Sequence, residues 1–211
     1  MAFFKDIADR CMHKINKNLT QFPEEDDSDK QKSVHWPLKY AGVSKLYAGC
    51  TFNTYKGNAK LVTDLIEIAK TDNSLILRGN TGCGKTHLAV AMIENKNYHD
   101  VRFITVPDLL LKIRSSFNNP SGVNEDEIIR EYSEIPILVL DDLGAEKTSE
   151  FAITTLYIIL DRRIRDCRKT IITTNLSKEE IEATFGARIA SRLAGMENIK
   201  INMPDNRKKR S

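Results

Sequence analysis

The chain of 211 residues lacks clustered cysteines and long apolar runs, and both absences narrow its possible functions. Its four cysteines include no CxxC pair, so a structural zinc site, which needs several ligands at short spacing, is not expected. The longest apolar stretches, 135–140 and 152–160, are too short or too interrupted to span a membrane, which takes about 20 apolar residues. The N-terminus has no apolar core of a secretory signal. We therefore expect a cytoplasmic protein without membrane contact.

An excess of charge of one sign is also missing, because 32 Lys and Arg face 29 Asp and Glu, a net charge of +3. The last twelve residues carry +4, which leaves −1 for the rest of the chain. The basic balance therefore belongs to the C-terminal tail and does not by itself indicate a nucleic-acid surface. Hydrophobic residues make up 41% of the chain and charged residues 29%, which disfavours wholesale disorder and predicts a single mid-sized folded domain.

Four segments are expected along the chain. Residues 1–22 repeat apolar side chains every four positions, which predicts an amphipathic helical arm. Residues 23–46 begin with an acidic run and are interpreted as a linker and lead-in. Residues 47–207 form the folded domain, and 208–211 form a basic tail. The apolar face of the arm either packs on the domain or binds another protein, and both possibilities remain open.

From residue 74 onward, short aliphatic and β-branched runs alternate with helical stretches. The alternation predicts an α/β fold with a parallel sheet covered by helices on both faces. The expected strands are 75–77, 102–106, 137–140, 170–174 and 199–201. The expected helices are 85–97, 107–117, 125–132, 149–167 and 178–185. Because the second strand intervenes in the sequence, we expect another strand to separate the first from the third in the sheet.

Residues 79–86 have the sequence GNTGCGKT, which matches the phosphate-loop pattern GxxxxGK[ST] between an expected strand and an expected helix. The glycines let backbone N–H groups face a phosphate, and the helix N-terminus adds partial positive charge. We expect Lys85 to bind the β- and γ-phosphates and the Thr86 hydroxyl to bind Mg²⁺. The expected ligands are therefore ATP and Mg²⁺. The residues expected to bind them are Gly79, Asn80, Thr81, Gly82, Cys83, Gly84, Lys85 and Thr86.

Two carboxylates, Asp141 and Asp142, follow the apolar run 137–140. Adjacent acids at the end of a buried strand are unfavourable without a counter-charge, which Mg²⁺ provides. We expect Asp141 to hold the ion through its water shell, and Asp142 to orient or deprotonate the attacking water. Asn175 ends the next expected strand, where its amide is suited to contact the water and the γ-phosphate. The alternative for Asn175 is a turn or a helix cap.

These motifs, in this order, resemble those of the AAA+ ATPases of the DnaC/DnaI helicase-loader and IstB transposition-helper group. The resemblance covers about residues 47–207 and includes CTFNTY at 50–55, DRR at 161–163 and GARIASRL at 186–193. It implies a P-loop NTPase fold of the AAA+ (ASCE) type, with a five-stranded parallel sheet between helices. Because little chain follows the fifth expected strand, no C-terminal helical lid domain is expected.

By this resemblance, Asp141 and Asp142 match the Walker B pair and Asn175 the sensor 1 residue. Arg188 and Arg192 match the arginine-finger region, and Arg192 is the stronger match. A guanidinium that reaches the nucleotide of a neighbouring copy neutralises charge on the γ-phosphate, so hydrolysis is expected to require self-association. The alternative is a pair of solvated or salt-bridged arginines, because the two are spaced i and i+4 on one helix face.

The resemblance also implies single-stranded DNA binding, through positions that match Phe117, Ser149 and Phe151. Stacking on aromatic rings combined with basic contacts gives binding that tolerates many sequences. The basic residues considered with them are Lys112, Arg114 and Lys147. A core position is the alternative for both phenylalanines.

The implied function is ATP-dependent loading of a replicative DNA helicase onto DNA. Hydrolysis is expected to be slow, because Asp142 stands where the commoner AAA+ motif has a longer glutamate. An IstB-like helper ATPase acting with a transposase is the alternative within the group. A stand-alone kinase and an adaptor whose assembly is controlled by ATP are the alternatives from other classes.

Overall fold

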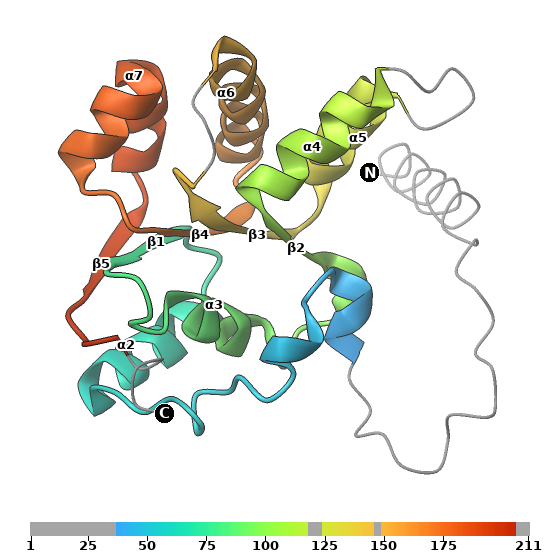
Figure 1. Ribbon diagram of the computed structural model, residues 1–211. Helices are drawn as coiled ribbons and strands as arrows, with labels where there is room; N and C mark the ends of the chain where they lie inside the picture. Colours follow the sequence, from blue (N-terminus) through green and yellow to red (C-terminus); the bar gives the residue numbers. More distant parts are fainter. Residues whose placement is uncertain (1–36, 118–123, 146–148, 206–211) are drawn as a thin grey trace, which may run out of the picture. The chain divides into compact units, whose positions relative to one another are not determined.

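The structure, a computed structural model, describes residues 37–117, 124–145 and 149–205 (Figure 1). The expected arm 1–22, the tail 208–211, most of the linker and Lys147 lie outside the described residues. Within the described part of the chain, no helix is long and apolar enough to cross a membrane.

Five parallel strands form one sheet in the order β2-β3-β4-β1-β5. The strands are β1 (Leu75–Gly79), β2 (Val101–Thr105), β3 (Ile137–Leu143), β4 (Lys169–Thr174) and β5 (Glu197–Ile201). All five expected strands are present, although their ends shift by one to three residues. β4 lies between β1 and β3, which confirms that another strand separates the phosphate-loop strand from the acid strand.

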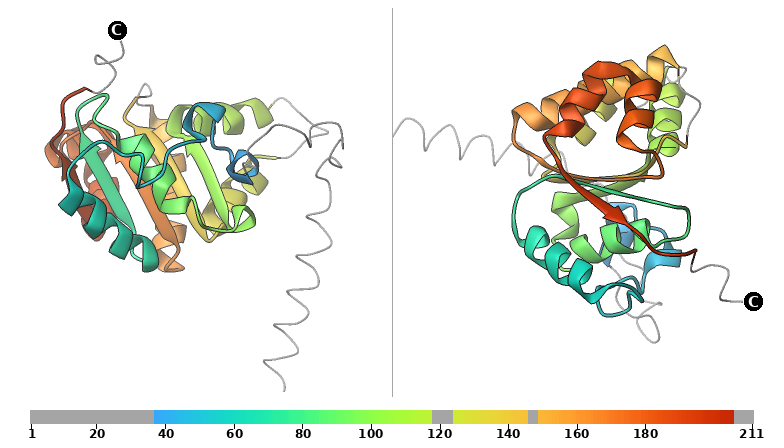
Figure 2. Two further views of the ribbon diagram at one scale, coloured as in Figure 1. Left: turned by 90° about the horizontal axis from the view of Figure 1, so that it is seen from below. Right: turned by 90° about the vertical axis from the view of Figure 1, so that its left-hand side faces the viewer.

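Helices cover both faces of the sheet, and Figure 2 shows β5 at its open edge between the two layers. The helices are α2 (Ala59–Lys70), α3 (Lys85–Ile93), α4 (Val106–Ser116), α5 (Glu125–Glu134), α6 (Glu150–Arg165) and α7 (Lys178–Ala194). α2 and α3 lie on one face, and α4 to α7 lie on the other (Figure 1). Burial from both sides explains the continuous apolar strand sequences, such as Leu75, Ile76 and Leu77, each at most 1% exposed. The expected α/β fold with a five-stranded parallel sheet is therefore confirmed.

The C-terminal ends of two expected helices differ from the prediction by four residues or more. α3 ends at Ile93, four residues before the expected end at 97. α7 continues to Ala194, whereas the sequence predicted a helix over 178–185 only. Gly186 has non-helical dihedrals inside α7 (φ 83°, ψ 164°), so the expected helix is the part before this kink. No helical lid follows β5 within the described residues.

α2 was not expected from the sequence. The Asn58 side chain accepts hydrogen bonds from two backbone N–H groups of the first turn and so caps its N-terminus. Leu65 is fully buried and anchors the helix on its face of the sheet. The sequence signal was therefore present, as a capping residue followed by an amphipathic stretch.

The lead-in before the expected domain is part of the described unit, which begins at Pro37 rather than at residue 47. It contains two short 3₁₀ helices, η2 (Pro37–Ala41) and η3 (Lys45–Tyr47), and Leu38 is 4% exposed. Gly42 has φ +94°, and a Cβ there would collide with the carbonyl oxygen of Phe103 on the edge strand β2. Glycine is therefore required where this segment crosses the edge of the sheet.

Arg163 is fully buried and ties the amino-terminal ends of β3 and β4 together. Its guanidinium donates to the Ile135 carbonyl at 2.7 Å and to the Lys169 carbonyl at 2.6 Å. The other acceptors are the carbonyls of Tyr132, Ser133 and Pro136 and the Thr170 hydroxyl. Burial lowers the pKa of Arg163 to about 9, so the side chain stays charged at neutral pH. The last arginine of the DRR motif thus fixes the two strands that carry the acids and Asn175.

Candidate nucleotide-binding site

The phosphate loop joins β1 to α3 at the carboxyl edge of the sheet. Gly82 and Gly84 have left-handed backbone, with φ values of 77° and 95°. Gly84 is also the N-cap residue of α3 and uses no side-chain cap, so the helix N-terminus stays free of a competing side chain. The loop therefore has the geometry of an anion-binding turn.

Lys85 is the first residue of α3 and is only 5% exposed. Its ammonium donates to the carbonyl oxygens of Gly79 and Asn80, both at 3.0 Å, and to Asn175 Oδ1 at 2.5 Å. The structure thus brings Lys85 and Asn175 together from neighbouring strand ends. Its ammonium is held at the phosphate loop by neutral oxygens only, which an anionic group can replace.

Thr86 and Asp141 also meet at this edge. The Thr86 hydroxyl lies 3.0 Å and 3.2 Å from the two carboxylate oxygens of Asp141. Asp141 is 2% exposed, and burial raises the pKa of its carboxyl, an effect opposed by the hydrogen bond from Thr173. A hydroxyl beside a buried carboxylate is a set of hard oxygen ligands that suits Mg²⁺.

Asp142 sits on a β-bulge and has left-handed backbone, with φ 57°. The β3–β4 register shifts between Leu140 and Leu143, so the acid pair occupies an irregular part of the ladder. The Asp142 N–H donates to the Thr173 hydroxyl at 2.9 Å. Left-handed backbone is uncommon in residues other than glycine, although aspartate adopts it more readily than most, and here it coincides with the bulge.

The CTFNTY segment at 50–55 holds the phosphate loop from outside. The Tyr55 hydroxyl donates to the Cys83 carbonyl at 3.3 Å, and the Tyr55 ring meets the His87 ring edge-on at 5.5 Å. His87 Nε2 lies 2.8 Å from the Thr51 carbonyl oxygen. A Cβ on Gly84 would lie 2.6 Å from the Tyr55 ring. The sequence motif pointed to this segment without a role for Tyr55, and nothing singled out His87.

The chain after β5 passes over the same loop. A Cβ on Gly79 would lie 2.5 Å from the Ile201 carbonyl oxygen, and one on Gly82 would collide with the Asp205 carboxylate. Cys83, between these glycines, is fully buried. The loop is thus enclosed by the chain's own segments on two sides.

The two arginines of α7 have different environments. Arg192 donates to Asp161 at 2.8 Å, and its guanidinium lies 5.7 Å from the centre of the Tyr157 ring. Asp161 raises the pKa of Arg192. Arg188 is exposed, and among the described residues neither arginine contacts the phosphate loop or the acid pair. Within one copy, the salt-bridged alternative therefore describes Arg192.

Three of the residues considered for DNA contact lie together at the C-terminal end of α4 and the start of α6. The rings of Phe117 and Phe151 meet edge-on at 5.7 Å, and the Arg114 guanidinium lies 5.6 Å from the Phe151 ring centre. Phe117 is 53% exposed, which excludes a core position, whereas Phe151 packs partly against the core. Ser149 caps α6 by accepting the Ala152 N–H.

Lys112 contacts residues of α5 rather than this aromatic pair. Its ammonium lies 3.2 Å from Glu131 and 3.3 Å from the Tyr132 hydroxyl. Glu131 also accepts a hydrogen bond from Arg102 at 3.0 Å. Lys112 is therefore occupied by acidic and phenolic partners, and Arg114 is the better placed basic residue.

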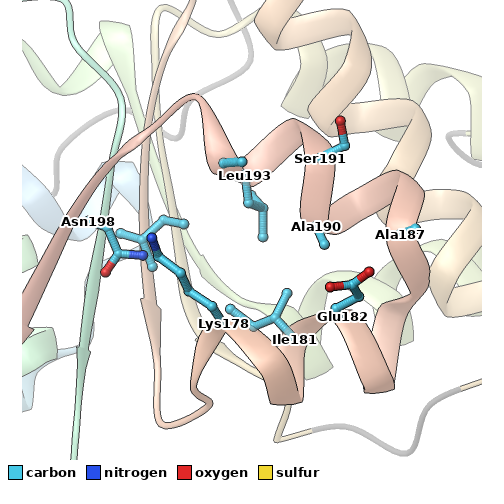
Figure 3. Close-up of a pocket in the computed structure, with 10 residues that line it drawn as sticks. Lys178, Ile181, Glu182, Ala187, Ala190, Ser191, Leu193 and Asn198 are labelled. Atoms are coloured by element: carbon cyan, nitrogen blue, oxygen red, sulfur yellow. The ribbon is translucent and has the colours of Figure 1, made fainter.

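A hollow of about 440 Å³ lies between α7 and the strands β1 and β5 (Figure 3). Apolar side chains of α7, including Ile181, Ala190 and Leu193, line it together with Lys178 and Asn198. It contains no residue of the phosphate loop and no residue that the sequence predicted for a site.

A family model described as IstB-like ATP binding protein matches residues 24–194. The replicative helicase loader DnaC of Buchnera aphidicola subsp. Baizongia pistaciae is 31% identical over 166 residues, which cover 74% of this chain and 68% of that protein. The protein of the same name from Buchnera aphidicola subsp. Acyrthosiphon pisum is 28% identical over an alignment of 222 positions, which covers 92% of this chain and 90% of that protein.

A solved structure has the same fold. The crystal structure of the DnaC helicase loader aligns with a TM-score of 0.66 and 24% identity, and the alignment covers 75% of this chain and all of that one. The AAA+ fold and the resemblance found in the sequence are therefore confirmed.

Proposed function

Because the chain belongs to the IstB-like ATP-binding protein family, we propose that it is an ATPase of the helicase-loader type. In this role it binds ATP and Mg²⁺, assembles on single-stranded DNA and delivers a replicative DNA helicase to DNA. This function belongs to the cytoplasm. The observation that carries the proposal is the convergence of Lys85, Thr86, Asp141 and Asn175 at one edge of the sheet. The names of the relatives described above support the choice of partner.

The residues at this edge fit a nucleotide and Mg²⁺. Left-handed glycines keep side chains out of the loop where phosphate oxygens bind backbone N–H groups. Thr86 and Asp141 supply the hydroxyl and carboxylate oxygens that Mg²⁺ prefers. When bound, Mg²⁺ withdraws charge from the phosphates and so favours attack by water on the γ-phosphate.

Phosphate binding replaces the contact between Lys85 and Asn175. Without nucleotide, the Lys85 ammonium donates to neutral oxygens, and phosphate oxygens displace them because they carry negative charge. Lys85 then stabilises charge on the β- and γ-phosphates, and the released Asn175 amide orients the water. Asp142 orients this water or accepts its proton. Its side chain is one methylene shorter than glutamate, which is consistent with slow turnover.

Arg192 completes the site of a neighbouring copy, with Arg188 beside it. The ion pair with Asp161 fixes the orientation of the Arg192 side chain. The side chain is still 38% exposed, so a neighbouring copy can reach it. A fixed guanidinium that neutralises γ-phosphate charge increases hydrolysis by about 10³ to 10⁵ in related reactions. Hydrolysis therefore depends on self-association.

Single-stranded DNA binds across the aromatic pair Phe117 and Phe151, next to Ser149. Phe117 offers an exposed ring for stacking, and Arg114 adds charge beside Phe151. The exposed ring favours unpaired bases, because bases in a duplex are already stacked. An IstB-like helper that acts with a transposase remains the second candidate, favoured by the family match, and it predicts tighter binding to duplex DNA.

ATP turnover measured against protein concentration, with and without single-stranded DNA, tests the proposal. We compare the native chain with Lys85→Ala and Arg192→Ala, and Arg165→Ala serves as a control because it also pairs with Asp161. Turnover per molecule should rise with concentration and DNA, and both site variants should lose it. Turnover that is independent of concentration and survives loss of Arg192 contradicts the assembled ATPase and supports a stand-alone kinase.

Turnover that is absent while ATP still drives assembly supports a nucleotide-controlled adaptor. Co-elution with a purified replicative helicase, in ATP and in its absence, then tests the partner. Co-elution with a transposase and preference for duplex DNA would replace the helicase loader with the transposition helper.

A further inference from the structure

We propose that Thr173, a buried residue of β4, is a positioning residue that sets the geometry of the acid pair Asp141 and Asp142. The inference rests on the proposed ATPase function, because it assigns to Thr173 the task of holding the side chains that act on Mg²⁺ and water. The sequence pattern gave Thr173 no role beyond a strand position.

One hydroxyl connects both acids. Thr173 Oγ1 lies 2.6 Å from Asp141 Oδ1 and 2.9 Å from the Asp142 backbone nitrogen. The backbone N–H of Asp142 can only donate, so the hydroxyl accepts that bond and gives its own proton to the Asp141 carboxylate. The directions of both bonds are therefore fixed. A side chain without a hydroxyl breaks both at once.

The strand register explains why a side chain is needed here. Leu140 pairs with Ile172, and the next pair joins Leu143 to Thr174. Two residues of β3, Asp141 and Asp142, therefore face the single residue Thr173 of β4, which defines a bulge. A bulge leaves a backbone group without its ladder partner, and the Thr173 hydroxyl provides that partner for the Asp142 N–H. The left-handed conformation of Asp142 is held by this bond.

The remaining contacts of Asp141 show what depends on Thr173. The Thr86 hydroxyl lies 3.0 Å from the same carboxylate oxygen, Oδ1, that accepts from Thr173. Thr173 is fully buried, so water does not replace its hydroxyl. Loss of the hydroxyl frees the carboxylate to rotate away from Thr86 and lets the bulge relax. Neither change removes a residue that contacts a ligand.

Thr174 is a matched control because it is equally buried and also uses its hydroxyl. It donates to the Leu143 carbonyl at 2.7 Å and accepts from the Leu176 N–H, and both partners of its hydroxyl are backbone groups. Thr174→Val therefore removes a buried threonine hydroxyl from the same strand without touching the acid pair. Comparison of the two valine variants separates positioning from general loss of stability.

The test compares full-length Thr173→Val, Thr173→Ser, Thr173→Ala and Thr174→Val chains. Fluorescent ATP binding is measured in Mg²⁺ and in EDTA, together with kcat, KM and the melting temperature. Outer-shell partners of metal ligands typically contribute about 10- to 100-fold to affinity or activity. We expect Thr173→Val to lose about that factor in kcat and in the Mg²⁺-dependent gain of ATP affinity, with binding in EDTA unchanged.

Rescue defines the role further. Thr173→Ser keeps the hydroxyl and should retain both properties, whereas Thr173→Ala should lose them, although both lack the methyl group. If the valine variant does not fold, the comparison of Thr173→Ser with Thr173→Ala tests the positioning role. Thr174→Val should melt at a lower temperature and keep the Mg²⁺ gain. Equal losses in Thr173→Val and Thr174→Val, or native values in Thr173→Ala, overturn the positioning role.

Failure of the underlying function has a different signature. A native chain that shows no Mg²⁺-dependent ATP binding and no turnover sensitive to Lys85→Ala removes the ATPase and the positioning role together. A native chain that binds and hydrolyses ATP, with Thr173 variants indistinguishable from it, removes the positioning role alone.

Discussion

Replacement of Arg163 by methionine should remove a large part of the stability of the domain. The side chain is fully buried, and its removal deprives five carbonyls and one hydroxyl of the bonds that it donates. Hydrogen bonds to a charged group contribute about 1.5–3 kcal/mol each, and removal of the buried charge returns several kcal/mol of desolvation. We expect a net loss of about 3–5 kcal/mol, in the upper range for a single substitution that breaks a buried hydrogen-bond network. Domains of this size have about 5–15 kcal/mol in total.

Urea unfolding in EDTA, without nucleotide, measures this loss. Arg165→Met on the same helix is the control, because Arg165 is 67% exposed and should lose no more than about 1 kcal/mol. Arg163→Lys should fall between the two, since an ammonium has three donors against the five of a guanidinium. If Arg163→Met unfolds within about 1 kcal/mol of the native chain, the buried guanidinium does not tie β3 to β4.

The pH dependence of the same measurement follows from the pKa of Arg163. Burial lowers this pKa from its usual value to about 9, so the unfolded chain binds the proton more tightly than the folded chain. The cost of burying the charge is fully present below pH 9, and it decreases above pH 9 as the folded chain releases the proton. The difference between native and Arg163→Met chains should therefore stay constant between about pH 6 and 8.

Three further outcomes are expected. Phe117→Ala should weaken single-stranded DNA binding by about 1–3 kcal/mol in a fluorescence anisotropy titration. Leu111→Ala, at a 65% exposed position of the same helix, should not, and equal effects would argue against stacking. Asp205→Asn should raise ATP affinity by about two- to tenfold, because a carboxylate beside Gly82 repels phosphates; an unchanged affinity in calorimetry contradicts this. Exposed Cys167 should react with a maleimide within minutes and buried Cys83 should not, which peptide mass spectrometry checks.

The sequence predicted the features that depend on local pattern. The phosphate loop, the acid pair and Asn175 each follow an apolar strand, and parallel strands bring their carboxyl ends to one edge. The meeting of Lys85 with Asn175 and of Thr86 with Asp141 follows from that geometry. The roles of these residues in catalysis stay predictions.

Other features depend on contacts between distant segments and could not be predicted. Thr173 resembles any β-branched strand residue until the bulge places two acids opposite it. Arg163 lies in a motif with charged neighbours, and only the packing of α6 shows that it is buried. The pairing of Arg192 with Asp161 spans 31 residues, and no spacing rule links them. Helix α2 is different, because the sequence contains its signal, a capping residue Asn58 followed by an amphipathic stretch, although the helix was not among the expected elements.

The close approach of the C-terminal segment to the phosphate loop changes how glycine variants must be interpreted. An alanine at Gly79 would push against the Ile201 carbonyl even in a chain that never meets a nucleotide. Glycine at position 79 therefore meets two separate requirements, which are access of the ligand to the loop and close packing of β5 against it. A change of loop conformation on nucleotide binding would be felt directly by β5, at the open edge of the sheet. The phosphate loop and the edge strand therefore pack against each other at Gly79, and a substitution there disturbs both.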